Sequence, residues 1–335
     1  MNTPPSAEPQ AMSSQALSRR AALAALLGTP VAAARAQTLG DRAFTLMVPF
    51  SPGTTIDVLG RLIAEHLRKR LNAAAAVENR VGGSGTIATQ AVARAQPDGH
   101  TLLVTTNTFV TTPSLMPGMT YDPLVDFAPV SMLVTGAIAL CVHPSLPADS
   151  VQSFVALAKA RPGRIDYAST GNGSPQHLTM ALFSQAAGIQ LTHVPYRGSA
   201  GALPDLAAGT VQAMMVPLNA AVPLRRDGRL RILAIASGRR SDIAPDVPTL
   251  AEAGFAELEV DLWFGLLAPA RTPPVVIRRL NEEVALMLAE PSVAQLLGNQ
   301  ALVPAAGPPD AFRTFLAEDR ARWAKVIRDA NITAD

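Results

Sequence analysis

Short apolar runs alternate with amphipathic helical patterns along most of the chain, and this alternation limits the fold more than any other feature. The run FTLMVPF (44–50) precedes a helical pattern over 55–71, and AAAVENR (74–80) precedes another over 85–95. Strand-like runs that alternate with helices form units with largely parallel strands. The sequence therefore predicts an α/β fold.

Two long apolar segments, 137–143 and 259–268, interrupt this alternation, and the patterns after the second segment are all helical. We interpret both segments as crossings between two lobes. A chain that leaves one lobe, builds another and returns forms a hinged pair with a cleft, which is a common position for a small ligand. The expected lobe 1 comprises 37–138 with 263–335, and the expected lobe 2 comprises 139–262.

The N-terminal 36 residues have the pattern of an export signal. Arg19 and Arg20 precede an alanine- and leucine-rich run, and Ala34-Arg35-Ala36 supplies a small-x-small cleavage site. The apolar run is shorter than the roughly 18–20 residues that span a bilayer. We therefore expect residues 1–36 to be removed from a protein exported to the periplasm, by either the general secretory or the twin-arginine route.

The remaining chain is electrically neutral. The whole sequence carries 28 basic and 26 acidic residues, and the first 36 residues hold three arginines against one glutamate, which leaves 25 of each sign in the rest. Nucleic-acid binding and attachment to anionic lipid both require a concentrated basic surface. Neither partner is expected.

No pattern in the sequence predicts catalysis, a metal or a cofactor. No serine has the Gly-x-Ser-x-Gly flanks of a hydrolase nucleophile, and the match of GGSGTIA (82–88) to a dinucleotide-binding loop is weak. Cys141 is the only cysteine, so it forms no internal disulfide, and its apolar surroundings predict a buried hydrophobic residue. We interpret His66 as a solvated helix residue. The five histidines lack metal-site spacing: His66, His100, His143, His177 and His193.

The stretch VPFSPGTTID (48–57) joins the first strand pattern to the first helical pattern. Thr54 and Asp57 have the spacing of a capping box, which predicts a helix N-terminus at this point. Gly53 permits close approach of the backbone, and the free N–H groups of a first helical turn attract anions without an arginine. The loop can bind a carboxylate or simply turn the chain, and the stretch alone does not decide between these.

A second loop of the same kind, STGNGSPQH (169–177), lies in the other expected lobe. It also leads from a strand pattern into a helix, and the hydroxyls of Thr170 and Ser174 can donate to carboxylate oxygens. Loops at the carboxyl ends of strands are frequent ligand sites in α/β folds. Two such loops, one in each lobe, can hold the same small anion between them.

The motifs, in their order, resemble one family. VPFSPGTTIDVLGRLIA, VENRVGGSGTIA, AQPDGHTLL, YASTGNGSPQHLTMALF, HVPYRGSAGALPDLAAGTV and DLWFGLLAPARTP are similar to successive signatures of the tripartite tricarboxylate transporter solute receptors, the Bug-like extracytoplasmic proteins. The resemblance covers essentially all of 40–335. It implies a two-lobed, type II-like periplasmic binding protein whose loops hold a ligand carboxylate, largely through backbone amides and ordered water.

The resemblance also assigns site residues. The usual Pro-Gly-Gly of the first loop is Pro52-Gly53-Thr54 here, and a Phe-Asp-Asn-like stretch is replaced by Met215-Val216-Pro217. We expect this substitution to make one wall of the cleft apolar, which favours a plain organic acid over an amino acid. The implied ligand-binding residues are Phe50, Ser51, Gly53, Thr54, Thr55, Asp57, Thr170, Gly171, Asn172, Gly173, Ser174, His177, Tyr196, Arg197 and Gly198.

The function expected from this resemblance is capture of a small organic carboxylate and its delivery to membrane transporter subunits. We expect a monomer without catalytic residues, metal or cofactor. Two alternatives stay open on the sequence: a sensory accessory that presents the ligand to a membrane receptor kinase, and a secreted hydrolase or isomerase that uses the same cleft.

Overall fold

The computed structural model describes Met1, Leu39, 42–116, 118–196 and 198–333. The expected signal peptide therefore lies outside the described residues, apart from Met1, and so does Arg197. The fold is described below for Leu39–Asp335, which form one compact unit. Among the described residues of this unit, no helix is long and apolar enough to cross a membrane.

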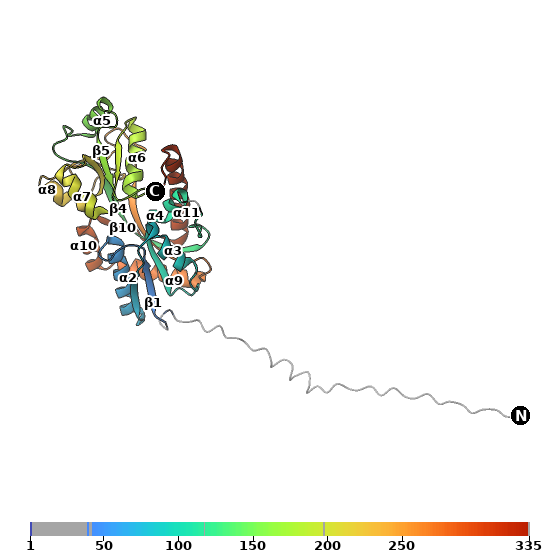
Figure 1. Cartoon of the computed structure of the whole chain (residues 1–335). Coiled ribbons are helices and arrows are strands. Elements are labelled where there is room, and N and C mark those ends of the chain that lie inside the picture. Colours follow the sequence, from blue (N-terminus) through green and yellow to red (C-terminus); the bar gives the residue numbers. More distant parts are fainter. Residues whose placement is uncertain (2–38, 40–41, 117, 197, 334–335) are drawn as a thin grey trace. The chain divides into compact units, whose positions relative to one another are not determined.

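The unit combines a mixed sheet with helices that cover it (Figure 1). The strands are β1 (Phe44–Val48), β2 (Ala75–Asn79), β3 (Thr101–Thr106), β4 (Phe127–Val142), β5 (Asp166–Ser169), β6 (Thr192–Pro195), β7 (Ala213–Pro217), β8 (Arg231–Ile235), β9 (Asp261–Pro269) and β10 (Leu302–Pro304). The helices are α2 (Thr55–Leu71), α3 (Thr86–Ala93), α4 (Thr108–Leu115), α5 (Val151–Ala160), α6 (Pro175–Ala187), α7 (Ser199–Ala208), α8 (Leu218–Arg226), α9 (Pro274–Leu288), α10 (Pro291–Asn299) and α11 (Pro309–Asp329). A short 3₁₀ turn, η1 (Gly83–Gly85), precedes α3.

The described strands form one sheet in the order β2-β1-β3-β9-β4-β7-β5-β6, with β8 and β10 also paired to β4. In its first half, β1 is parallel to β2 and β3, while β9 is antiparallel to β3 and to β4 as far as Ala137. In its second half, β4 pairs from Ile138 onward with β7, and β5 is parallel to β6 and β7. The single strand β4 thus belongs to both halves.

The strand directions determine where the two predicted loops lie. Because β4 runs in the same direction as β1 and passes from the first half into the second, the carboxyl end of β1 points toward the second half. Strand β5 runs opposite to β4, so its carboxyl end points back toward the first half. The loops after β1 and β5 are therefore both directed at the junction of the halves.

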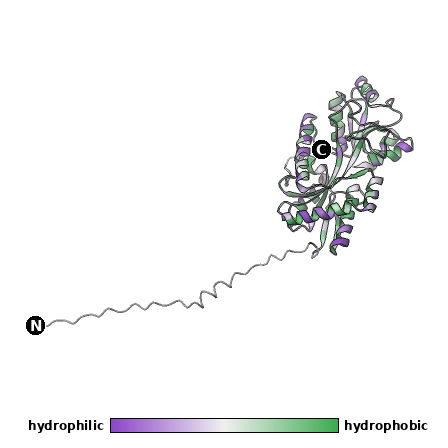
Figure 2. Cartoon of the chain, turned by 180° about the vertical axis from the view of Figure 1, so that it is seen from behind, coloured by the Kyte–Doolittle hydropathy of each residue, from purple (hydrophilic) through white to green (hydrophobic). Residues whose placement is uncertain are grey.

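Apolar side chains at helical spacing fix the helices on the sheet. In α2, Ile56, Leu59, Ile63 and Leu67 are all buried, as the sequence pattern predicts. Figure 2 shows the same arrangement along the chain, with hydrophobic strands inside and hydrophilic faces on the outer helices. The α/β prediction is confirmed.

Some elements differ from the sequence prediction. Helices α4 and α8 were not predicted; each contains an internal proline, Pro113 and Pro223, which normally argues against a helix. Only the end of the long strand β4 was predicted, since Pro129 and Gly136 interrupt its strand pattern. The GGSG loop packs tightly against the first loop: a Cβ at Gly85 would lie 3.1 Å from Pro49.

Candidate ligand-binding site

The first loop, between β1 and α2, is held by Asp57. The Gly53 N–H donates to Asp57 Oδ2 at 2.9 Å, and Asn79 Nδ2 donates to Asp57 Oδ1 at 2.9 Å and to the Phe50 carbonyl at 2.9 Å. Arg61 adds hydrogen bonds of 2.8 and 3.1 Å to the same carboxylate. These contacts fix both the backbone of the loop and the start of the helix.

Asp57 stabilises the loop from its buried side. Its side chain is 3% exposed and both of its oxygens accept hydrogen bonds from this chain. Burial raises the pKa of Asp57, but hydrogen bonds from Arg61, Gly53 and Asn79 outweigh burial and hold the pKa below its ordinary value. The carboxylate is therefore ionised at neutral pH and stabilises the N-terminus of α2.

The predicted capping box is wrong in its hydrogen bonds. Thr54 is the N-cap of α2, but its side chain accepts no capping bond and instead donates to the Ser51 carbonyl at 2.8 Å. Asp57 reaches one residue further back than a capping box requires, to Gly53. The surface of the loop remains open, because Ser51, Gly53 and Thr54 are exposed and Thr55 is half-buried.

The second loop, between β5 and α6, is built in the same way. Ser174 is the N-cap of α6 and accepts the His177 N–H at 3.3 Å. The Gly173 N–H donates to His177 Nδ1 at 3.1 Å, and the Gly171 N–H donates to Ser169 Oγ at 3.1 Å. Thr170, Gly171 and Asn172 are half-buried, whereas Gly173 and Ser174 are buried.

His177 likewise stabilises the second loop from its buried side. It is 7% exposed, and its ring stacks on His193 with centroids 3.8 Å apart. Burial lowers the pKa of His177 to about 3, and the neighbouring His193 acts in the same direction. The imidazole is therefore neutral at pH 7 and accepts the Gly173 N–H at Nδ1.

The two loops share one backbone arrangement. Each has a glycine with positive φ just before the N-cap, Gly53 at 83° and Gly173 at 70°. In each, the side chain four residues later, Asp57 or His177, accepts the N–H of that glycine. In the first turn of α2 the N–H groups have no acceptor within the helix. In the first turn of α6 Pro175 has no N–H and the His177 N–H is bonded to Ser174, which leaves the Gln176 N–H. Both loops thus present helix N-termini to the junction of the halves.

A contact across the junction brings α4 to the second loop. A Cβ added at Gly173 would lie 2.0 Å from Leu115 Cδ1, so only glycine leaves room for this leucine. Leu115 ends α4, which follows β3 in the first half of the sheet. The second loop therefore packs directly against the first half of the fold.

The third predicted segment lies beside the second loop. The Tyr196 N–H donates to the Ser169 carbonyl at 3.1 Å, and the Tyr196 hydroxyl donates to Asp205 Oδ2 at 2.6 Å. Gly198, with φ of 104°, precedes α7. The remaining member of the segment, Arg197, lies outside the described residues.

The expected apolar wall is not formed by Met215 and Val216. Both side chains are fully buried, and they pack into separate hydrophobic clusters on the two faces of β7. Only Pro217 is partly exposed. The replacement of the family's Phe-Asp-Asn-like stretch by Met215-Val216-Pro217 therefore gives no support for a ligand with an apolar part.

Two surface hollows lie away from the loops. One, of about 290 Å³, includes Ala93, Val125 and Arg271, and the other, of about 360 Å³, includes Ser150 and Arg225. Neither is lined by a predicted site residue. Among the described residues, no group of His, Cys, Asp and Glu is arranged to hold a metal ion.

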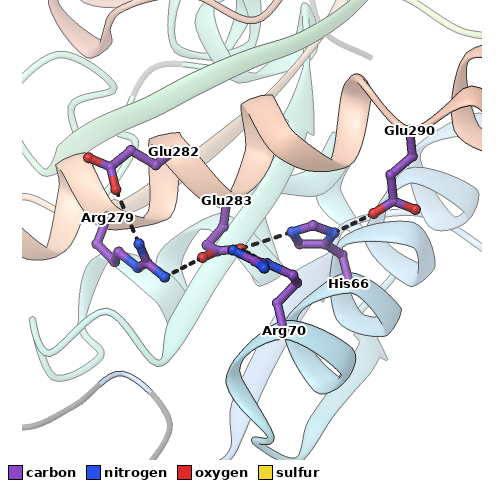
Figure 3. Close-up of polar contacts among 6 residues, drawn as sticks. All are labelled: His66, Arg70, Arg279, Glu282, Glu283 and Glu290. Carbon is purple, nitrogen blue, oxygen red and sulfur yellow. Dashed lines mark hydrogen bonds and ion pairs between the residues drawn. The ribbon is translucent and has the colours of Figure 1, made fainter.

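A polar cluster between α2 and α9 is structural (Figure 3). His66 is 6% exposed, so the prediction of a solvated histidine is wrong. Its Nε2 lies 2.9 Å from Glu283 and its Nδ1 lies 2.8 Å from Glu290. Arg70 and Arg279 also pair with Glu283, at 3.4 and 2.6 Å. The cluster joins α2 to α9.

The fold and the paired loops define a two-lobed, type II-like periplasmic binding protein. The model of the tripartite tricarboxylate transporter family receptor matches residues 59–332, and the chain belongs to this family. It is 37% identical to protein BugT of Bordetella pertussis over 296 residues, which cover 88% of this chain and 91% of BugT. The family and the fold are those of solute-binding proteins.

Solved structures of relatives contain carboxylates. Rpa4515 of R. palustris with adipate is 36% identical with a TM-score of 0.79, over 88% of this chain and 99% of that chain. MatC of Rhodopseudomonas palustris with bound malate is 31% identical with a TM-score of 0.76, over 86% of this chain and 99% of that chain.

Proposed function

We propose that this protein binds a small organic carboxylate between its two loops and delivers it to a tripartite tricarboxylate-type membrane transporter. The observation that carries the proposal is the pair of helix N-termini, α2 and α6, at strand ends directed toward one junction. The N-terminus of α2 offers the N–H groups of its first turn, the N-terminus of α6 offers the N–H of Gln176, and each adds the positive end of a helix dipole. Both features favour an anion.

The geometry suits a carboxylate ligand. Two donor-bearing loops from opposite sides can each serve one end or one oxygen of the anion, and the hydroxyls of Thr55 and Ser51 add donors to the first loop. The adipate and malate bound by two relatives belong to the same chemical class. The proposed site consists of the fifteen residues inferred from the family resemblance, with Asp57 and His177 acting through the loop backbone.

The proposal includes export and domain organisation. We assign residues 1–36 to a cleaved signal peptide, 37–138 with 263–335 to lobe 1, and 139–262 to lobe 2. The switch of β4 from β9 to β7 partners, between Ala137 and Ile138, supports a boundary at this point. The exported protein would act in the periplasm as a monomer.

A thermal-shift screen of the purified exported protein over mono-, di- and tricarboxylates tests ligand class. A ligand present at 100 times its dissociation constant should stabilise the fold by about 2.7 kcal/mol. The bound acid should be recovered unchanged, since the proposal assigns no catalytic group. A screen in which amines or sugars stabilise and carboxylates do not would refute the proposal.

Co-purification with membrane proteins tests the transport partner. The proposal predicts ligand-dependent association with the transporter's membrane subunits. Association with a membrane receptor kinase instead would favour the sensory alternative, and turnover of the bound acid would favour the enzymatic one.

A further inference from the structure

We infer that the side-chain amide of Gln176 donates a hydrogen bond to the bound carboxylate and contributes to ligand selection. This inference rests on the proposed function and adds a residue that the sequence analysis did not include. Gln176 is in the first turn of α6, two residues after the N-cap Ser174. In this turn Pro175 has no N–H and the His177 N–H is held by Ser174, so the backbone N–H of Gln176 is the one left uncapped.

One end of the Gln176 amide is held by the second loop. Thr170 Oγ1 donates to Gln176 Oε1 at 2.9 Å. Thr170 directly follows β5, whose carboxyl end is directed at the junction of the halves. With its oxygen engaged by the loop, the amide has only its NH₂ group to offer.

The other end of the amide has no acceptor within the described part of the chain. Gln176 is 8% exposed, yet its NH₂ group makes no hydrogen bond to any described residue. The amide nitrogen is not among the fully buried side-chain atoms that lack a partner, so it reaches solvent, where water or a ligand oxygen can accept from it. A carboxylate oxygen at the N-terminus of α6 supplies that acceptor.

The first loop has no equivalent group. The matching position of α2 is Ile56, which is 3% exposed and packs into the core. The ligand therefore meets backbone donors from α2, and both backbone and side-chain donors from α6. A neutral NH₂ group favours an oxygen acceptor and gives no attraction to an ammonium group.

Isothermal titration with adipate and with malate tests the inference. Gln176→Met keeps the side-chain length and removes the donor, and should weaken binding about 10-fold or more, as expected for one hydrogen bond to a charged acceptor. Gln176→Glu should weaken binding further at pH 7.5, because it places a carboxylate against the ligand. That additional loss should shrink as the pH falls toward the ordinary glutamate pKa of about 4.3.

Gln152 is the matched control. It also lies in the first turn of a helix capped by a serine, Ser150 of α5, but its amide donates to the Ala253 carbonyl at 3.1 Å. Gln152→Met should leave the affinity unchanged. Thr170→Val, which removes the hydroxyl that orients the amide, should weaken binding, and the double variant with Gln176→Met should lose less affinity than the sum of the two single losses.

Three outcomes would overturn these ideas. Wild-type protein that binds neither these acids nor any other carboxylate of the screen would overturn the proposed function and the inference with it. Wild-type binding that persists unchanged in Gln176→Met would overturn the inference alone. Should Gln176→Met fail to fold, unchanged binding in folded Thr170→Val would overturn it.

Discussion

Asp57→Ala should loosen the first loop and weaken ligand binding together. The substitution removes the acceptor of the Gly53 N–H and of one Asn79 N–H. The amide of Asn79 is half-buried, and a buried donor left without a partner costs about 1–3 kcal/mol. Gly53 is exposed, so water can replace part of its lost bond. We expect a loss of about 2–4 kcal/mol in the free energy of unfolding.

Urea denaturation and isothermal titration measure the two effects. The affinity should fall about 10-fold or more, because the loop backbone then has to be ordered by the ligand. Arg61→Ala is the comparison: Arg61 is 57% exposed, and Gly53 and Asn79 still hold Asp57, so its removal should reduce both quantities less than Asp57→Ala does. Asp57→Ala protein with wild-type stability and affinity would refute the supporting role.

The pH dependence of Asp57 gives an independent check. Its pKa in the folded protein is below the ordinary value, so the carboxylate stabilises the fold fully above its unfolded pKa of about 3.9. That contribution is lost as the pH falls through the lower folded pKa. The stability difference between wild type and Asp57→Asn should therefore be constant from pH 5 to 8 and shrink below about pH 4. A difference that shrinks near neutral pH would contradict the pKa direction.

Three further predictions concern the second loop and the α2–α9 cluster. Gly173→Ala should cost more than Gly53→Ala, because both require strained positive φ at about 1–2 kcal/mol but only Gly173 meets Leu115; Leu115→Ala should recover part of the difference in urea denaturation. Because the pKa of His177 is about 3 in the fold and about 6.5 when unfolded, stability should decline as the pH falls from 6.5 toward 3, by up to about 1.4 kcal/mol per unit, and His177→Gln should remove this decline. Glu283→Ala should cost about 3–5 kcal/mol, since it leaves the buried Nε2 of His66 without its partner and unpairs Arg70 and Arg279; a change in melting temperature within error would contradict this.

The sequence predicted the fold class and the positions of both loops. Both features follow from local residues: the alternation of strand and helix patterns gives the fold class, and a glycine before the start of each helix marks the loops. Local patterns were insufficient for β4, whose strand continues through Pro129 and Gly136 because β9 and β7 pair with it on successive halves. Tertiary pairing, which the sequence does not display, overrode the local signals there.

The contacts behind the loops were not predictable in the same way. A side chain four residues after a glycine can face the N-cap, the glycine or solvent, and only the folded backbone selects Gly53 for Asp57. The spacing Gly-x-x-x-Asp and Gly-x-x-x-His was the available signal. Gln176 gave no signal, since a glutamine in a first helical turn is ordinary. The prediction that Met215 and Val216 line the cleft is wrong, because hydrophobic clusters cover both faces of β7 and bury these side chains.

The most direct test of the account is the affinity for an acid compared with that for its neutral primary amide. The measurement is isothermal titration of the exported protein with the best carboxylate from the screen and with the amide of the same skeleton. If the helix N-termini and the Gln176 NH₂ group bind the carboxylate of the ligand, the neutral amide ligand should bind at least about 100-fold more weakly than the acid, since it lacks the charge and one acceptor oxygen. Equal affinity for the acid and the amide would show that the loops do not recognise a carboxylate.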